Sequence, residues 1–148
     1  MANTKFNATV TSINGCEVSA ETRDFKITVD EPKSSGGTNK GMNPVELLLN
    51  SLGACQVIAA KSFAKAKGIK LNKLKVEEEG ILDPDGFSGK NPNVPKGFSE
   101  IKSTFFIDAD NTDEEIQNFV DFVNSICPVH NTLEHTPKMD TAIKTYVK

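Results

Sequence analysis

The chain has 148 residues, of which 37% are hydrophobic and 25% are charged, and its formal net charge is -3. This length and balance predict one globular domain, residues 1–148, and exclude a disordered chain. An acidic chain lacks the basic face that phosphate binding needs, so we expect no nucleic-acid partner.

The same sequence predicts a cytoplasmic protein with no membrane partner. Its N-terminus, MANTKFNATV, has no apolar stretch behind a basic start, so we expect no signal peptide. The longest apolar region, residues 45–60, is interrupted by polar side chains and does not resemble a membrane span. In a cytoplasmic chain, the three cysteines favour redox chemistry over a structural disulfide framework.

The N-terminal region predicts three strands and a loop. Residues 5–12, 16–22 and 24–30 each alternate apolar and polar side chains, as half-buried strands do. Asn14 and Gly15 form a two-residue turn signal between the first two strands. Residues 31–41 are rich in Gly, Ser and Pro and predict a loop.

A long helix follows. Asn43 suits the N-cap, Pro44 suits the first helical position, and Glu46 stands where a capping box places its acid. Gly68 is the expected C-cap. Residues 45–60 are apolar nearly all round and lysines occur only in the last turns, so we expect an enclosed first half and a solvent-exposed end.

The remaining elements predict an α+β fold in the order βββ-α-ββ-αα-β. Residues 70–83 and 98–109 read as strands, joined by a loop that could be a flap, and the acids at 77–79 read as ordinary surface charge. Thr112 and Glu115 form a capping box for an amphipathic helix that ends near residue 126. A short helix begins at Pro128, and residues 141–148 predict a final strand.

Two cysteines are the candidates for chemistry. Cys55 lies within the long apolar helix, and Cys127 stands at the expected N-cap of the short helix, where free backbone N–H groups can lower a thiol pKa. They are far apart along the chain, so only the fold can bring them together. A cysteine pair without metal-ligand spacing suggests peroxide or disulfide chemistry, in which a sulfenic acid on one sulfur condenses with the other thiol.

The motifs GMNPVELLLNSLGACQV and ICPVHNTL, with DFKITVDEP ahead of them, resemble the OsmC/Ohr superfamily of osmotically induced and organic hydroperoxide resistance proteins. The resemblance covers nearly the whole chain from about residue 8. It implies an OsmC-like fold, with curved antiparallel sheets around a long central helix in an intertwined homodimer. It also implies a thiol peroxidase for organic hydroperoxides, with Cys55 as the attacking thiol, Cys127 as the resolving thiol and a dithiol as reductant.

The chain departs from the superfamily pattern around these cysteines. Active members usually have Glu directly after the motif proline, where this chain has Val45 and places its acid at Glu46. Arg23 is the sole arginine and the candidate cation of the site, although it does not align with the superfamily's arginine. The catalytic candidates are therefore Cys55, Cys127, Glu46 and Arg23, with no cofactor and no metal expected.

Other interpretations stay open at this point. The chain could be a non-catalytic dimer that binds an apolar small molecule in the interfacial pocket. His130 could act on Cys127 as a donor or a base, because it lies three residues further along the same helical face. A metal set of both cysteines with His130 and His135 has no standard ligand spacing. Cys16 matches no motif and reads as structural.

Overall fold

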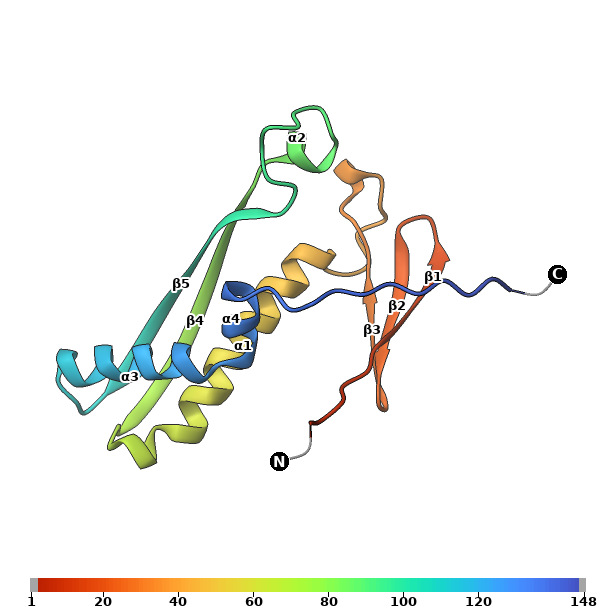
Figure 1. Cartoon of the computed structure of the whole chain (residues 1–148). Coiled ribbons are helices and arrows are strands. Elements are labelled where there is room, and N and C mark those ends of the chain that lie inside the picture. Colours follow the sequence, from red (N-terminus) through yellow and green to blue (C-terminus); the bar gives the residue numbers. More distant parts are fainter. Residues whose placement is uncertain (1–2, 147–148) are drawn as a thin grey trace. The chain divides into compact units, whose positions relative to one another are not determined.

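The computed structural model describes residues 3–146 as a mixed α+β fold with antiparallel strands and one long helix (Figure 1). The chain divides into two compact units, one ending at Asn50 and the other beginning at Ser51. The predicted α+β class is confirmed, while the single domain stays a prediction.

The first unit contains a three-stranded antiparallel sheet. Its strands β1 (Thr9–Asn14), β2 (Glu17–Thr22) and β3 (Phe25–Val29) are paired in sequence order. The predicted turn joins β1 to β2, with Gly15 at a φ of 56°, a conformation that glycine adopts without steric cost. The strand predicted over residues 5–12 begins four residues later than expected, at Thr9.

The loop after β3 is organised by Asp30, which is only 1% exposed. Its carboxylate accepts hydrogen bonds from the backbone N–H groups of Glu31, Thr38 and Lys40 and from the Thr38 hydroxyl, at 2.6 to 3.2 Å. The 3-10 helix η1 (Lys33–Ser35) lies within this loop. The glycine- and serine-rich segment is therefore a fixed turn built around a buried anion.

The long helix α1 (Pro44–Phe63) begins as predicted. The Asn43 side chain accepts the Glu46 N–H at 2.9 Å, and the Glu46 carboxylate accepts the Asn43 N–H at 2.8 Å, which is a capping box. The predicted end at Gly68 is corrected, because α1 stops at Phe63. A 3-10 turn, η2 (Lys65–Lys67), follows, and Gly68 caps that turn with a φ of 72°.

The expected burial of the first half of α1 is wrong for the described chain. In this half Val45 is 38% exposed and Leu48 is 37% exposed, and in the second half Ile58 is 65% exposed. Leu52, Gln56 and Ala60 are buried. These three buried residues are spaced four apart, so one stripe of the helix faces the protein. Of the apolar residues on its other sides, some, such as Val45 and Ile58, are exposed, and others, such as Leu47 and Val57, are half-buried.

The second unit pairs two long antiparallel strands, β4 (Leu71–Leu82) and β5 (Phe98–Ala109). A short helix, α2 (Pro84–Phe87), forms in the connecting loop, where no helix was predicted. The amphipathic helix α3 (Asp113–Ile126) has the predicted capping box at Thr112, and α4 (Pro128–Glu134) follows it directly. Figure 1 shows α3 running beside the β4–β5 ribbon.

The hydrophobic core of the second unit lies where α1 and α3 meet this two-stranded sheet. Its buried members are Ala60, Ala64, Ile69, Phe119 and Val123. Phe105 and Leu74 pack against them from the strands. The core therefore fixes the end of α1, the middle of α3 and the face of β4–β5 that carries the site described below.

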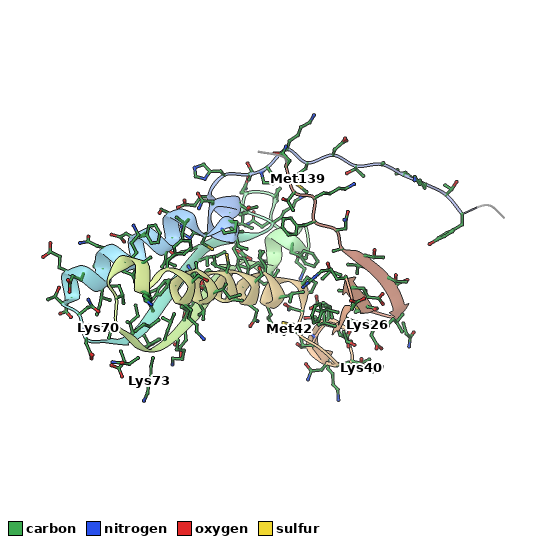
Figure 2. The ribbon with its side chains drawn as sticks, turned by 90° about the horizontal axis from the view of Figure 1, so that it is seen from below. Lys26, Lys40, Met42, Lys70, Lys73 and Met139 are labelled. Atoms are coloured by element: carbon green, nitrogen blue, oxygen red, sulfur yellow. The ribbon has the colours of Figure 1, made fainter. Side chains whose placement is uncertain are left out.

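The predicted C-terminal strand is wrong for the residues described. Residues 141–146 have no regular structure, and residues 147–148 lie outside the described part. A strand needs a partner for its backbone groups, and no strand of the described chain pairs with this segment. Ile143 in this segment is 87% exposed, and Met139, just before the segment, is 83% exposed (Met139 is labelled in Figure 2).

Among residues 3–146, no helix has both the length and the apolar character that a membrane crossing requires.

Candidate active site

The structure brings Cys55 and Cys127 together, although they are 72 positions apart in the sequence. Their Sγ atoms lie 2.8 Å apart, and the Cys127 thiol donates its S–H to the Cys55 sulfur. A disulfide holds its sulfurs at about 2.05 Å, so a small movement would close this bond. Both thiols are free in the structure.

The two cysteines differ in exposure. Cys127 is fully buried, whereas Cys55 is half-buried on α1. A reagent from solvent therefore reaches Cys55 first.

Cys127 is held at the junction of α3 and α4. Cys127 is both the C-cap of α3 and the N-cap of α4. Its Sγ accepts a hydrogen bond from the His130 N–H at 3.4 Å. Pro128 occupies the first position of α4, as predicted. The Asn131 side chain donates to the carbonyls of Asn124, Ser125 and Cys127 and so fixes the bend between the two helices.

The expected lowering of the Cys127 pKa at this helix N-terminus is wrong. Burial raises the pKa of the Cys127 thiol, and the hydrogen bond to Cys55 raises it further. The N–H of His130 opposes these effects without outweighing them. Desolvation destabilises the buried thiolate by more than the N–H groups of the short helix stabilise it, so Cys127 keeps its proton.

A buried amide ties the cysteine-bearing helix to both neighbouring layers. Gln56, the residue after Cys55, is fully buried. Its Nε2 donates to the Ser103 hydroxyl on β5 at 3.0 Å and to Asn124 Oδ1 on α3 at 3.1 Å. Its Oε1 is buried and has no hydrogen-bond partner. Gln56 therefore fixes the rotation of α1 beside Cys55.

Glu78 lies beneath the same stretch of α1. Its Oε2 accepts the Ser103 hydroxyl at 2.7 Å, and a Cβ added at Gly53 would lie 3.4 Å from the Glu78 Cγ. Its Oε1 is buried without a partner. Burial raises the pKa of the Glu78 carboxyl, while the hydrogen bond from Ser103 and the charge of His130 lower it.

This placement corrects the prediction of ordinary charge at residues 77–79 for Glu78 alone, since Glu77 and Glu79 are exposed. The strand alternation holds a signal for it, because Leu74, Val76, Glu78 and Gly80 share the partly buried face of β4. Sequence reasoning also missed Gln56, Ser103 and Asn124. A helical glutamine next to a cysteine has no sequence signature, and its two partners come from distant elements.

The two histidines differ in their surroundings. His130 is 26% exposed, and its Nε2 lies 3.3 Å from the Glu134 carboxylate one helical turn further on. His135 lies at the end of α4, with Nδ1 3.2 Å from the Asn131 carbonyl. Within the described residues, the structure gathers no group of three His, Cys, Asp or Glu side chains that could hold a metal ion.

The other two candidates, Glu46 and Arg23, belong to the first unit. Glu46 is the acid of the α1 capping box. Arg23 occupies the turn between β2 and β3 at a φ of 52°, and its guanidinium stacks 4.8 Å from the centre of the Phe25 ring. A role for either residue at the thiols stays a prediction. Cys16 is exposed, with its Sγ 3.8 Å from the Gly36 carbonyl.

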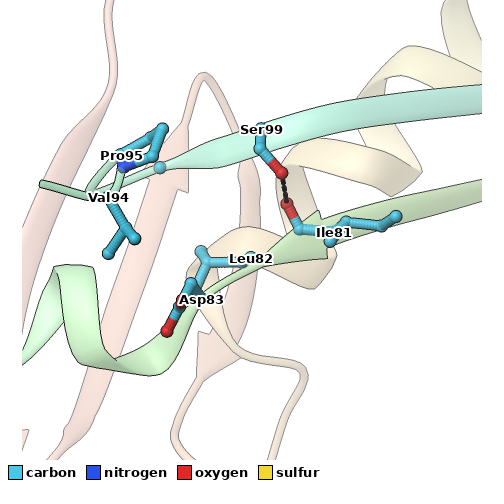
Figure 3. Close-up of a pocket in the computed structure, with 7 residues that line it drawn as sticks. Ile81, Leu82, Asp83, Val94, Pro95 and Ser99 are labelled. Carbon is cyan, nitrogen blue, oxygen red and sulfur yellow. Dashed lines mark hydrogen bonds between the residues drawn. The ribbon is translucent and has the colours of Figure 1, made fainter.

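A surface hollow of about 480 Å³ lies at the loop end of the β4–β5 hairpin. Ile81, Leu82, Val94 and Pro95 give it mainly apolar walls, and the Ser99 hydroxyl donates to the Ile81 carbonyl at its edge (Figure 3). Its lining includes neither Cys55 nor Cys127.

The fold and the site together define an α+β protein with a reduced thiol pair between a long helix and a short one. The comparisons with known proteins then place the chain in a family. The family model described as "OsmC-like protein" matches residues 37–142, and the chain belongs to this family.

The chain is 35% identical over 134 residues to a protein of Mycoplasma genitalium named hydroperoxide reductase, and the match covers 89% of each chain. It is also 35% identical to a hydroperoxide reductase of Mycoplasma pneumoniae, covering 88% of this chain and 87% of that one. A crystal structure of an OsmC-like protein from Mycoplasma pneumoniae matches with a TM-score of 0.79 and 32% identity, over 91% of both chains.

Proposed function

We propose that the protein is a cytoplasmic thiol peroxidase that reduces organic hydroperoxides through Cys55 and Cys127. The observation that carries the proposal is the 2.8 Å separation of the two sulfurs, one accessible and one buried. The two relatives named hydroperoxide reductase support the choice of a hydroperoxide as substrate.

In the first step, the Cys55 sulfur attacks the terminal oxygen of the hydroperoxide. An S–O bond forms and the O–O bond breaks. The alkoxide leaves with the bonding electron pair and takes up the proton lost by the Cys55 thiol, which gives an alcohol. The sulfur is oxidised to a sulfenic acid, and the peroxide is reduced by the same two electrons.

In the second step, the Cys127 sulfur attacks the sulfenic sulfur of Cys55. An S–S bond forms, the S–O bond breaks, and the hydroxide that leaves combines with the Cys127 proton to give water. The proximity of Cys127 protects Cys55 from irreversible oxidation. An external dithiol then restores both thiols by disulfide exchange, which suits the reducing cytoplasm.

The test uses a Cys16→Ser background, so that only the paired thiols remain to be counted. The reduced protein is mixed with excess cumene hydroperoxide, and free thiols and mass are followed with time. We expect both thiols to disappear together and the mass to fall by two hydrogens. Persistence of both thiols in excess hydroperoxide would contradict the proposal.

Two variants separate the proposed roles. Cys55→Ser should leave Cys127 reduced, because a buried thiol that retains its proton is a poor nucleophile. Cys127→Ser should still lose one thiol and should accumulate a sulfenic acid at Cys55 that dimedone traps. Trapping at Cys127 in the Cys55→Ser protein would reverse the assignment.

We also propose that the protein acts as a homodimer. The segment around Ile143 contains β-branched and aromatic residues that favour a strand, yet it lies exposed and unpaired in the described chain. The first half of α1 likewise exposes Val45. A second copy that supplies a strand edge and a covering surface would satisfy both features.

Sedimentation of the wild-type protein should therefore give the mass of a dimer. Ile143→Asp should weaken the dimer because it places a charge where an apolar side chain would be buried. Lys144→Asp, the matched change at the neighbouring position, should leave the dimer intact. A monomer at micromolar concentration for the wild type would rule out this assembly.

A second candidate function is the non-catalytic binding of an apolar small molecule. The apolar hollow beside Ile81 and Val94 favours it, because ligand sites are concave and mainly apolar. This alternative predicts that a fatty acid raises the melting temperature of the Cys55→Ser protein as much as that of the wild type. Protection that Val94→Asp abolishes would support it.

A further inference from the structure

The reaction between the two sulfurs depends on how precisely the fold holds Cys55 against Cys127, because reacting atoms must meet at a defined distance and direction. Their 2.8 Å separation has to shorten to about 2.05 Å for the bond to form. Cys55 lies on α1, whereas Cys127 lies at the junction of α3 and α4. The placement of α1 against α3 therefore sets the separation of the sulfurs.

The buried stripe of α1 contains one residue that can fix this placement. Leu52 and Ala60 bring only apolar side chains to the interior, and the attraction between apolar surfaces has no direction. Gln56, between them on the stripe, is fully buried and carries an amide. Hydrogen bonds need a defined distance and angle, so those of Gln56 resist both rotation and sliding of the helix.

Gln56 joins the two helices that lead to the sulfurs. Its Nε2 donates to Asn124 Oδ1 on α3 at 3.1 Å and to the Ser103 hydroxyl on β5 at 3.0 Å. Gln56 directly follows Cys55 on α1. Asn124 lies three residues before Cys127, in the last turn of α3. The bond between the two amides therefore ties the helical turn of one sulfur to the turn that leads into the other.

A third amide extends this tie to the backbone of Cys127. The Nδ2 of Asn131, on α4, donates to the Asn124 carbonyl at 3.3 Å and to the Cys127 carbonyl at 2.9 Å. The last carbonyl groups of a helix have no partner within the helix, and the Asn131 side chain supplies donors to them. Asn124 thus accepts one amide with its side chain and another with its backbone, so hydrogen bonds connect Gln56 to both sides of Asn124 and on to Cys127.

We propose that Gln56 is a positioning residue for disulfide formation, acting through Asn124 to hold the Cys55 sulfur within reach of the Cys127 sulfur. The inference rests on the disulfide step proposed above and deepens it. A displaced α1 would leave the buried amide of Gln56 without its partners, which costs free energy. The arrangement with the sulfurs close together is therefore favoured before any oxidant arrives.

The test follows disulfide formation without a hydroperoxide, in the Cys16→Ser background. The Cys55 sulfur attacks the disulfide of dithiobis-nitrobenzoate, loses its proton to solvent, forms a mixed disulfide and releases one coloured nitrothiobenzoate anion. The Cys127 sulfur then attacks the Cys55 sulfur and loses its proton to solvent. The mixed disulfide breaks and releases a second anion. The first release reports the reactivity of Cys55, and the second reports how well Cys127 is placed.

Gln56→Met keeps the length of the side chain and removes its hydrogen bonds. We expect the second release to slow by about tenfold or more, because a small misplacement of reacting atoms slows a reaction strongly. The first release should not change, and the slowing should be the same at every pH, since the proton affinity of neither thiol is the cause. Gln117→Met, the same change at an exposed glutamine on α3, is the matched control and should behave as the parent protein does.

Two further variants separate positioning from a loss of stability. Asn124→Leu and Ser103→Ala each remove one acceptor of the same buried Nε2, so both lose a hydrogen bond of Gln56. Asn124→Leu also cuts the link between α1 and α3, and it should slow the second release about as much as Gln56→Met does. Ser103→Ala keeps that link and should leave the rate close to that of the parent.

Equal slowing by Asn124→Leu and Ser103→Ala would overturn the inference, because the rate would then follow stability and not the link between the helices. A parent protein that releases a single anion would overturn it as well. If Gln56→Met fails to fold, the other two variants decide the question. A rapid second release in a protein whose thiols resist hydroperoxide would refute the peroxidase proposal and leave the positioning role intact.

Discussion

Two carboxyl groups, one in each unit, have opposite surroundings: Asp30 is buried, and Glu78 is half-buried with its Oε1 enclosed. Asp30 receives four hydrogen bonds from its loop, and its pKa is lowered to about 2, first by the Thr38 hydroxyl. Glu78 receives one hydrogen bond, keeps an oxygen without a partner, and has a raised pKa because it is desolvated. A fully bonded buried anion holds a loop in place, whereas a partly bonded one stays ready to exchange a proton.

The largest expected effect comes from removing each charge across a range of pH. Asp30 binds its proton less tightly in the folded state, so its contribution is complete above about pH 4 and is lost as the pH falls toward 2. Glu78 holds its proton more tightly in the folded state, so its contribution is complete at acid pH and is lost as the pH rises through its raised pKa.

Asp30→Asn should therefore greatly destabilise the loop at neutral pH. The amide nitrogen of Asn cannot accept the hydrogen bonds that a carboxylate oxygen accepts from the backbone N–H groups. Its effect should shrink toward pH 2. Glu78→Gln should change stability little in acid and become relatively favourable at higher pH. Urea unfolding and amide exchange of residues 31–40 over a pH series measure both effects. Parallel pH profiles for the two variants would break the comparison.

The sequence predicts those features of the structure that depend on residues close together in the chain. The helix starts at Asn43 and Thr112 were predicted from residues three positions apart, and both capping boxes are present. The long strands followed from alternation. The N-cap position of Cys127 followed from the proline after it. Each of these signals lies within one turn or one strand, where chain geometry alone sets the contacts.

The sequence could not supply terms that depend on packing between elements. Cys127 is buried by elements that are distant from it in the sequence. This burial raises the pKa of Cys127 by more than the N–H groups of the helix terminus lower it. The link from Gln56 to Ser103 spans 47 positions, and nothing in either segment marks it. Likewise, the C-terminal segment has a strand pattern but no partner strand in the described chain, and a pattern cannot provide the partner.

Two variants that each remove one hydroxyl donor test the difference between Asp30 and Glu78, and we expect effects of intermediate size on stability. Thr38→Val removes the 2.6 Å donor to Asp30, and Ser103→Ala removes the 2.7 Å donor to Glu78. The pKa of each carboxyl should rise. At neutral pH, Thr38→Val should lower the urea midpoint clearly, because the Asp30 charge remains buried with fewer donors.

The loss of the Glu78 hydrogen bond in Ser103→Ala should cost less than about 1 kcal/mol, because Glu78 can take up a proton instead of keeping an unsatisfied charge. The variant also removes one acceptor of the buried Gln56 Nε2, so the total loss is larger by the cost of that bond. Carboxyl titration by NMR, alongside the urea midpoints, measures the pair. A larger loss of stability for Ser103→Ala than for Thr38→Val would show that the Glu78 network is also a structural one.

The smallest expected effect concerns the helix surface above Glu78. An added Cβ at Gly53 would lie 3.4 Å from the Glu78 Cγ and 3.7 Å from its unpartnered Oε1, which are ordinary contacts. Gly53→Ala should therefore stabilise the protein by up to about 1 kcal/mol, since alanine is the better helix former. The exposed neighbour offers the reverse change, Ala54→Gly, as a matched control that should lose a similar amount.

The two variants should differ at the carboxyl group. The Gly53→Ala methyl places an apolar group against the free oxygen of Glu78, so the pKa of Glu78 should rise further, whereas Ala54→Gly should not move it. Titration of the Glu78 carboxyl by NMR distinguishes the two. An unchanged Glu78 pKa in Gly53→Ala would mean that solvent, and not the helix surface, governs the proton on this carboxyl, and the contrast with Asp30 would then rest on hydrogen bonds alone.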